Sequence, residues 1–143
     1  MVREFAVNEI APVAAKLDQS SEFPWENVAK MAELGLLGVP WPEELGGAGM
    51  DYVSYTIAIN EVAKVDASHA ITISAHTTLG TSPIVAFGTE SQKEKYVPLP
   101  PSGQALAGFG LTEPQAGSDA GGTRTTARRA DGGLPPFIDP DYT

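Results

Sequence analysis

The chain has 143 residues, a formal net charge of −9 and no cysteine, with 42% hydrophobic and 19% charged residues. This composition is typical of a globular chain rather than a disordered one, and the acidic charge disfavours nucleic acid or an anionic membrane surface as a partner. The lack of cysteine excludes disulfides and thiolate metal sites, and no apolar run approaches the roughly 20 residues of a membrane span or resembles a secretory signal, so we expect a cytoplasmic protein.

The first hundred residues predict helices joined by loops rich in glycine and proline. Apolar residues recur at helical spacing over residues 2–17, and Pro12 inside this stripe should kink or split the helix because its ring clashes with the carbonyl four residues back. Pro24 is well placed to open a second helix over residues 25–34. Gly35 then predicts a left-handed C-terminal cap.

Further along, prolines and glycines make residues 36–50 irregular, and Asp51 is a plausible N-cap for a helix that runs to about residue 65. Ser68 is expected to cap the next helix, which Gly80 should stop. Thr89, with Gln92 three residues later, forms a capping box that opens the last helix before a proline-rich break.

Beyond that break the pattern changes from helix to strand. Residues 105–111 form a short apolar run, and residues 123–129 are rich in β-branched side chains, so both predict strands. Two strands alone make a marginal sheet, which suggests the first hairpin of a larger β domain. The predicted fold is therefore mainly α (α+β overall): a helical domain over 1–103, opening strands and a loop over 104–129, and an irregular tail over 130–143.

The loop between these strands carries the most chemical information. Residues 109–119 read FGLTEPQAGSD, in which small side chains let backbone N–H groups approach an anion, while Thr112 and Ser118 can donate further hydrogen bonds. The segment suits a phosphate or the polar edge of a cofactor, although it matches neither a P-loop nor GxGxxG. A plain turn, with Pro114 and Gly117 as turn residues, is the alternative.

Three motifs, in this order, resemble the acyl-CoA dehydrogenase family: AELGLLGVP at 32–40, FGTESQK at 87–93 and TEPQAGSD at 112–119. The resemblance covers about residues 1–132. It implies an N-terminal helical domain, a middle β domain and a C-terminal helical bundle, usually assembled as homotetramers.

The resemblance also implies a reaction. An FAD-dependent enzyme of fatty acid β-oxidation would convert an acyl-CoA to the trans-2-enoyl-CoA, with the hydride passed to flavin N5 and an electron-transferring flavoprotein as the acceptor. The family's glutamate base would lie beyond this chain, so no catalytic residue is expected here.

Site residues follow from the same signature. The resemblance implies that Thr112 bonds the polar edge of the flavin ring, that Gly117 allows close backbone approach, and that Ser118 contacts both the FAD pyrophosphate and the acyl-CoA. Glu113 and Asp119 are assigned turn and packing roles. The cofactor-binding residues expected are Phe109, Gly110, Leu111, Thr112, Gly117 and Ser118.

No metal site is expected. His69 and His76 are seven residues apart, whereas a helical metal pair usually needs i, i+4 spacing and further ligands. A packing or surface role is the better interpretation of both histidines. Trp25 and Trp41, which flank prolines and glycines, are expected to anchor loops.

The resemblance stops after Gly133, where the family continues with an aromatic and threonine motif that covers the flavin. The chain is therefore expected to be an incomplete member of the family, inactive alone. One alternative is an inert helical remnant or interaction module of a truncated gene. Another is a flavin oxidase or monooxygenase of the same superfamily, with oxygen as acceptor.

Overall fold

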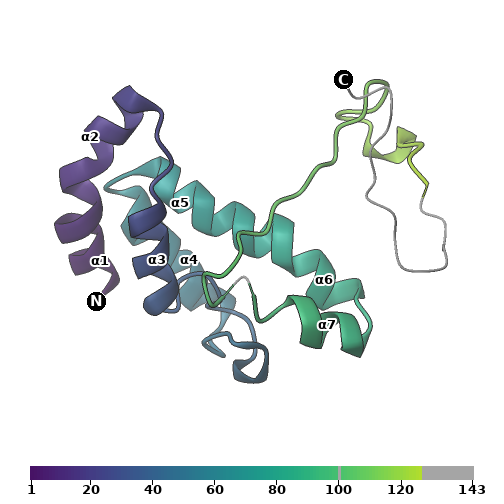
Figure 1. Ribbon diagram of the computed structural model, residues 1–143, viewed down its shortest axis with the longest axis horizontal. Coiled ribbons are helices and arrows are strands. Elements are labelled where there is room, and N and C mark those ends of the chain that lie inside the picture. Colours follow the sequence, from purple (N-terminus) through teal and green to yellow (C-terminus); the bar gives the residue numbers. More distant parts are fainter. Residues whose placement is uncertain (100, 127–143) are drawn as a thin grey trace. The chain divides into compact units, whose positions relative to one another are not determined.

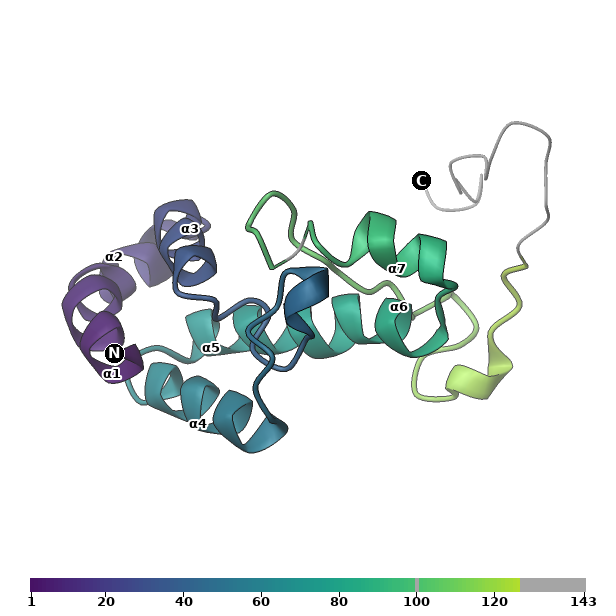
Figure 2. The same cartoon turned by 90° about the horizontal axis from the view of Figure 1, so that it is seen from below.

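The computed structural model describes residues 1–99 and 101–126, and the chain divides into two compact units, Met1–Phe109 and Gly110–Thr143. The first unit is helical (Figures 1 and 2). Its helices are α1 (Val2–Phe5), α2 (Ala11–Ser20), α3 (Trp25–Glu33), α4 (Tyr52–Ala63), α5 (Ala67–Ser74), α6 (Ser82–Phe87) and α7 (Glu90–Tyr96).

The N-terminal helix is split where Pro12 predicts it. A π-helical turn, Ala6–Ile10, joins α1 to α2, and the N–H of Ala11 bonds the carbonyl of Ala6, five residues back. Pro12 then occupies the first turn of α2. In a regular α-helix the Pro12 ring would clash with the carbonyl four residues back, and its missing N–H would leave that carbonyl unpaired. The wider π-helical turn lies at this position and avoids the clash.

Helix α3 ends as its sequence predicts. Gly35 has a φ of 71°, its N–H bonds the carbonyl of Ala32, and the N–H of Leu36 bonds the carbonyl of Met31. These two bonds form a Schellman motif, and the buried side chains of Leu36 and Met31 flank it. The cap thus turns the chain from the helix directly into the core.

The loop after α3 folds back on itself around a buried tryptophan. The N–H of Met50 bonds the carbonyl of Val39 at 2.9 Å, and Trp41 is only 4% exposed, in line with its expected role as an anchor. A Cβ on Gly47 would lie 2.1 Å from the carbonyl oxygen of Trp41, so only glycine fits there. Trp25, by contrast, is 65% exposed, and its ring lies 4.6 Å from that of Phe23 in the preceding loop, measured between ring centroids.

Two helix starts test the capping predictions. The Asp51 carboxylate accepts the N–H of Ser54 at 2.7 Å, which confirms it as the N-cap of α4. Helix α5 is capped by Asp66, whose carboxylate accepts the N–H of His69, and not by Ser68 as predicted. The Ser68 hydroxyl donates to Asp66 instead, two residues earlier, to the same carboxylate oxygen that accepts the N–H of His69.

The prediction that Gly80 stops a helix is also wrong. A π-helical segment, Ala75–Thr81, carries the helix from α5 into α6, so that the two lie end to end in Figures 1 and 2. Gly80 is buried inside this segment, against Ala107. The helix ends at Gly88, whose backbone is extended, and the predicted capping box of Thr89 and Gln92 then opens α7.

The core of the helical unit is formed by apolar side chains of α1, the π-helical turn that follows it, α3, α4, α5 and the loop after α3. Its buried members are Phe5, Ala6, Ile10, Val28, Met31, Leu36, Leu37, Val39, Tyr55, Ala58, Val62, Ala70 and Ile73. Within the described part of the chain, no helix is both long and apolar enough to cross a membrane.

The two predicted strands do not form in the described residues. Residues 105–111 have no strand pairing, and residues 123–129, described only as far as 126, show none up to that point. One isolated antiparallel bridge, between Glu113 and Ala116, is the pairing found there. A strand needs a neighbour to hydrogen-bond, and β-branched composition cannot supply one. The predicted tail over 130–143 lies outside the described residues.

Candidate functional site

The signature loop turns tightly just after Thr112. The N–H of Glu113 bonds the carbonyl of Ala116 at 2.9 Å, and the N–H of Ala116 returns to the carbonyl of Glu113 at 3.1 Å. Pro114 and Gln115 therefore occupy the two central positions of a closed turn. Proline is suited to such a position because its φ is already fixed.

A second closure is made by the carboxylate of Glu113. It accepts the backbone N–H of Arg124 at 2.8 Å and of Thr125 at 3.0 Å, and the side-chain amide of Gln115 at 2.5 Å. These donors, the Arg124 amide foremost, lower the pKa of Glu113 because they stabilise the ionised form. Residues 114–123 thus form a loop whose two ends are joined by the Glu113 carboxylate.

The predicted cofactor-binding residues lie on the outside of this region. The side chains of Phe109 and Leu111 are 55% and 43% exposed, and Thr112 and Ser118 are exposed as well. Thr112 and Gly117 lie close together, since a Cβ on Gly117 would meet the Thr112 methyl carbon at 3.9 Å. The loop therefore offers apolar and hydroxyl-bearing surface side by side.

Gly117 is not required by the fold of the described residues. Its φ is not in the left-handed region, and the contact of 3.9 Å to Thr112 is an ordinary one. A Cβ atom added to Gly110 would meet no atom within 4 Å. Backbone conformation and internal packing thus leave room for a Cβ atom at both glycines of the signature.

The segment that leads into the signature is fixed to the π-helical segment. The N–H of Ala107 donates to Nδ1 of His76 at 3.0 Å, and Gly80 allows the backbone of Ala107 to approach closely. Ala107 lies in the helical unit, two residues before its end at Phe109. His76 is therefore buried as a hydrogen-bonding partner for the chain itself.

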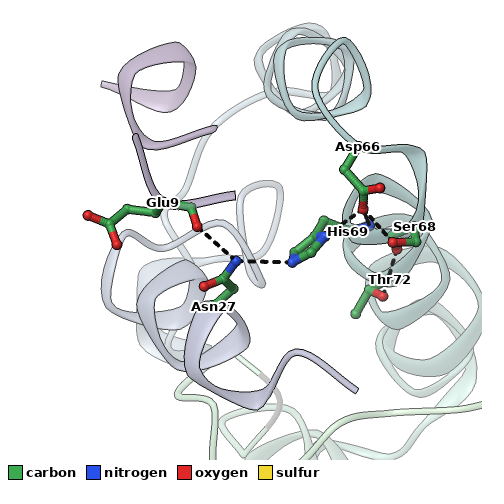
Figure 3. A network of polar contacts seen from close by, with 6 residues as sticks. All are labelled: Glu9, Asn27, Asp66, Ser68, His69 and Thr72. Carbon is green, nitrogen blue, oxygen red and sulfur yellow. Dashed lines mark hydrogen bonds and ion pairs between the residues drawn. The ribbon is translucent and has the colours of Figure 1, made fainter. Parts of the chain in front are cut away.

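His69 takes part in a second buried network (Figure 3). Its Nδ1 lies 2.6 Å from the Asp66 carboxylate, and its Nε2 lies 3.2 Å from the side-chain nitrogen of Asn27, which also donates to the carbonyl of Glu9. Because Asn27 donates to Nε2, the proton of a neutral ring belongs on Nδ1, where Asp66 accepts it. No group of three potential metal ligands occurs among the described residues.

The sequence predicts turn and packing roles for Glu113 and does not predict the contact between Gly80 and Ala107. Both depend on residues that the fold brings together, Glu113 with Arg124 and Gly80 with Ala107. The signature contains Glu113, but no sequence pattern indicates that its carboxylate binds the backbone amides of Arg124 and Thr125.

Comparison with known proteins defines the class. A model of the family described as "Acyl-CoA dehydrogenase, N-terminal domain" matches residues 1–104. This chain belongs to the acyl-CoA dehydrogenase family, as its three motifs predict.

Individual relatives agree with this assignment. The chain is 50% identical to an acyl-CoA dehydrogenase of Bacillus subtilis (strain 168), over 92% of this chain and 35% of that protein. It is 48% identical to a short-chain specific acyl-CoA dehydrogenase of Clostridium acetobutylicum, over 89% of this chain and 34% of that protein. The chain thus spans about a third of the length of these curated relatives.

A solved structure has the same fold. The crystal structure of an acyl-CoA dehydrogenase from Bacillus anthracis complexed with FAD superposes with a TM-score of 0.80 at 44% identity, over 88% of this chain and 22% of that one. The helical fold of residues 1–104 is therefore that of the N-terminal domain of the family.

Proposed function

We propose that this chain supplies the N-terminal helical domain and the start of the flavin-binding β domain of an FAD-dependent acyl-CoA dehydrogenase. The proposal keeps the boundary near residue 103 and assigns residues 104–129 to the β domain. It is supported by the family match, by the FAD named for the Bacillus anthracis relative, and by the geometry of the signature loop.

One observation carries the cofactor assignment. Gly117 lies in a tight, exposed loop, yet neither its backbone conformation nor its neighbours in the described chain demand glycine. A bound group that needs close approach to the backbone would demand it. Exposed Phe109 and Leu111 are suited to cover an apolar ring, and the hydroxyls of Thr112 and Ser118 are suited to its polar edge and phosphates. These residues therefore fit the flavin ring and the phosphates of FAD.

The chemistry proposed is α,β-dehydrogenation of an acyl-CoA thioester to the trans-2-enoyl-CoA. When bound, FAD supplies the hydride acceptor of this reaction. The role of this chain is to hold one side of the flavin and, through Ser118, to contact the acyl-CoA. No proton transfer is assigned to a residue of this chain.

The remaining parts of the proposal follow the family. The acceptor of the electrons is an electron-transferring flavoprotein, the complete enzyme is a homo-oligomer, and it works in the cytoplasm. Nucleic acid and membrane surfaces are not proposed as partners, because the net charge of −9 repels both.

A chimera tests the proposal. Residues 1–126 of this chain would replace the matching part of the Bacillus subtilis relative, to which the chain is 50% identical. We expect the chimera to purify with FAD and its flavin absorption to be bleached by butyryl-CoA without oxygen. A chimera that folds but stays colourless when FAD is added would contradict the proposal, and rapid reoxidation by oxygen would favour an oxidase.

Two glycine variants sharpen the result. Gly117→Val in the chimera should abolish FAD binding, while Gly121→Ala, whose Cβ would meet only Asp119 at 3.6 Å, should retain it. In the isolated chain neither change should alter stability, because a Cβ atom at either position would lie no nearer than 3.6 Å to another residue. Loss of stability with Gly117→Val would mean that the glycine serves the fold and not a ligand.

A further inference from the structure

Glu113 makes more structural contacts than a residue of an exposed turn requires. One carboxylate oxygen accepts the amides of Arg124 and Gln115, and the other accepts the amide of Thr125. Its backbone closes the short turn with Ala116 at the same time. The side chain thus joins the start of the loop to the segment that leaves it.

The loop closed in this way contains Gly117 and Ser118. On its returning side, the N–H of Gly122 bonds the carbonyl of Asp119 at 3.0 Å, and the Thr123 hydroxyl donates to the carbonyl of Ala120. Each of these contacts is local, whereas the carboxylate of Glu113 spans eleven and twelve residues. Among the hydrogen bonds named for the described residues, those of the Glu113 carboxylate join the two ends of the loop.

Two consecutive backbone amides facing one carboxylate form a small anion site that the chain fills itself. Charge-assisted hydrogen bonds of this kind are stronger than neutral ones. A loop whose ends are already fixed loses less conformational freedom when a ligand binds than a loop that must first be ordered.

We propose that Glu113 is a positioning residue: its carboxylate binds the amides of Arg124 and Thr125 and so preorders the loop that presents Gly117 and Ser118 to the phosphates of a dinucleotide. The ligand in this statement rests on the proposed function, whereas the preordering of the loop does not. Glu113 does not touch the ligand and takes no part in proton transfer.

The first test needs no ligand. In ¹⁵N-labelled protein, the amide resonances of Arg124 and Thr125 should shift together as the pH falls below the ordinary glutamate value of about 4.5, because the donors hold the pKa of Glu113 lower. Glu113→Gln should abolish this titration and speed hydrogen exchange at both amides about tenfold. Glu94→Gln, an exposed glutamate, is the control and should change neither.

Amides of Arg124 and Thr125 that titrate unchanged in Glu113→Gln, or that exchange at the wild-type rate in Glu113→Ala, would overturn the proposal. Intact helical circular dichroism in each variant shows that the helical unit still folds, so that loss of the titration reports on the loop alone.

The second test uses FAD and the chimera described above. Glu113→Gln should raise the dissociation constant of FAD about tenfold while leaving kcat at saturating FAD unchanged, as expected for a residue that orders a loop. An unchanged dissociation constant would overturn the role in ligand binding. If the amide titration holds but the wild-type chimera binds no FAD, the proposed function fails and the preordering by Glu113 stands.

Discussion

A Cβ atom on Gly80 would lie 2.4 Å from the Cβ of Ala107 and 2.6 Å from its carbonyl carbon. The glycine therefore lets the chain that enters the signature loop lie directly on the π-helical segment. The same backbone is held by His76, whose Nδ1 accepts the N–H of Ala107. Together these contacts fix the position of the last residues before Phe109 in the helical unit.

Gly80→Ala should destabilise the helical unit. Alanine favours helix over glycine by roughly 1 kcal/mol, but forcing a methyl group against backbone costs about 1–3 kcal/mol, so we expect a net loss. Urea unfolding followed by circular dichroism measures it. Gly108→Ala is the matched control, since its Cβ would meet nothing within 4 Å. Equal stability of the two variants would show that Ala107 moves aside freely.

Asn27→Ala should destabilise the same unit through the network of Figure 3. The change leaves the buried Nε2 of His69 and the carbonyl of Glu9 without their donor, which costs about 1–3 kcal/mol. The free energy of unfolding in urea is the measurement, and Asn60→Ala, at an exposed position of α4, is the control. A loss no larger than that of the control would contradict a structural role for this amide.

Acid should weaken the contact between the N-terminal helix and α4. Glu61 accepts from Arg3 at 2.7 Å and from Lys64 at 2.5 Å, and these hydrogen bonds lower its pKa from 4.5 to about 2. A lowered pKa means that the stabilisation is complete above pH 4.5 and is lost as the pH falls towards 2.

The matched variant for this prediction is Glu61→Gln. The difference in free energy of unfolding between wild type and variant should be constant from neutral pH to about 4.5 and should shrink below it. Using the difference removes the acid sensitivity of other carboxylates, such as Asp51 and Asp66, whose pKa values are also lowered. A difference that does not vary with pH would contradict the assignment.

The isolated chain of 143 residues should not retain FAD through gel filtration. The residues proposed to contact the cofactor lie on an exposed surface, so they offer contacts on one side while the entropic cost of binding remains. The absorption spectrum of the eluted protein is the measurement, with free FAD added beforehand. Stoichiometric flavin in the protein peak would contradict the prediction.

Local sequence patterns predicted much of the helical unit. Gly35 as a left-handed cap, Asp51 as an N-cap and the box of Thr89 and Gln92 are all confirmed, because each depends on residues within one turn. The sequence predicts Ser68 as a cap, whereas Asp66 caps the helix; both residue types cap helices, so pattern alone does not separate them.

The errors arise where distant residues meet. Gly80 resembles a helix stop, but its lack of a side chain serves a contact with Ala107 that no local pattern reveals. The predicted strands required partners that composition cannot provide. In the candidate site, the signature located the loop, whereas the part played by Glu113 became visible only once Arg124 and Thr125 were seen beside it. Which residues contact FAD stays a prediction.

The π-helical segment Ala75–Thr81 also governs how mutations can reshape this domain. Such a turn corresponds to an α-helix with one residue inserted, and each residue of an α-helix turns the next side chain by about 100°. Removing a single codon here, for example that of exposed Thr78, would restore regular α-helical winding, and α6 would keep its orientation about the helix axis because the wide turns already absorb the extra residue. A one-residue deletion in this segment would therefore remove the wide turns while the side chains of α6 keep facing the same neighbours.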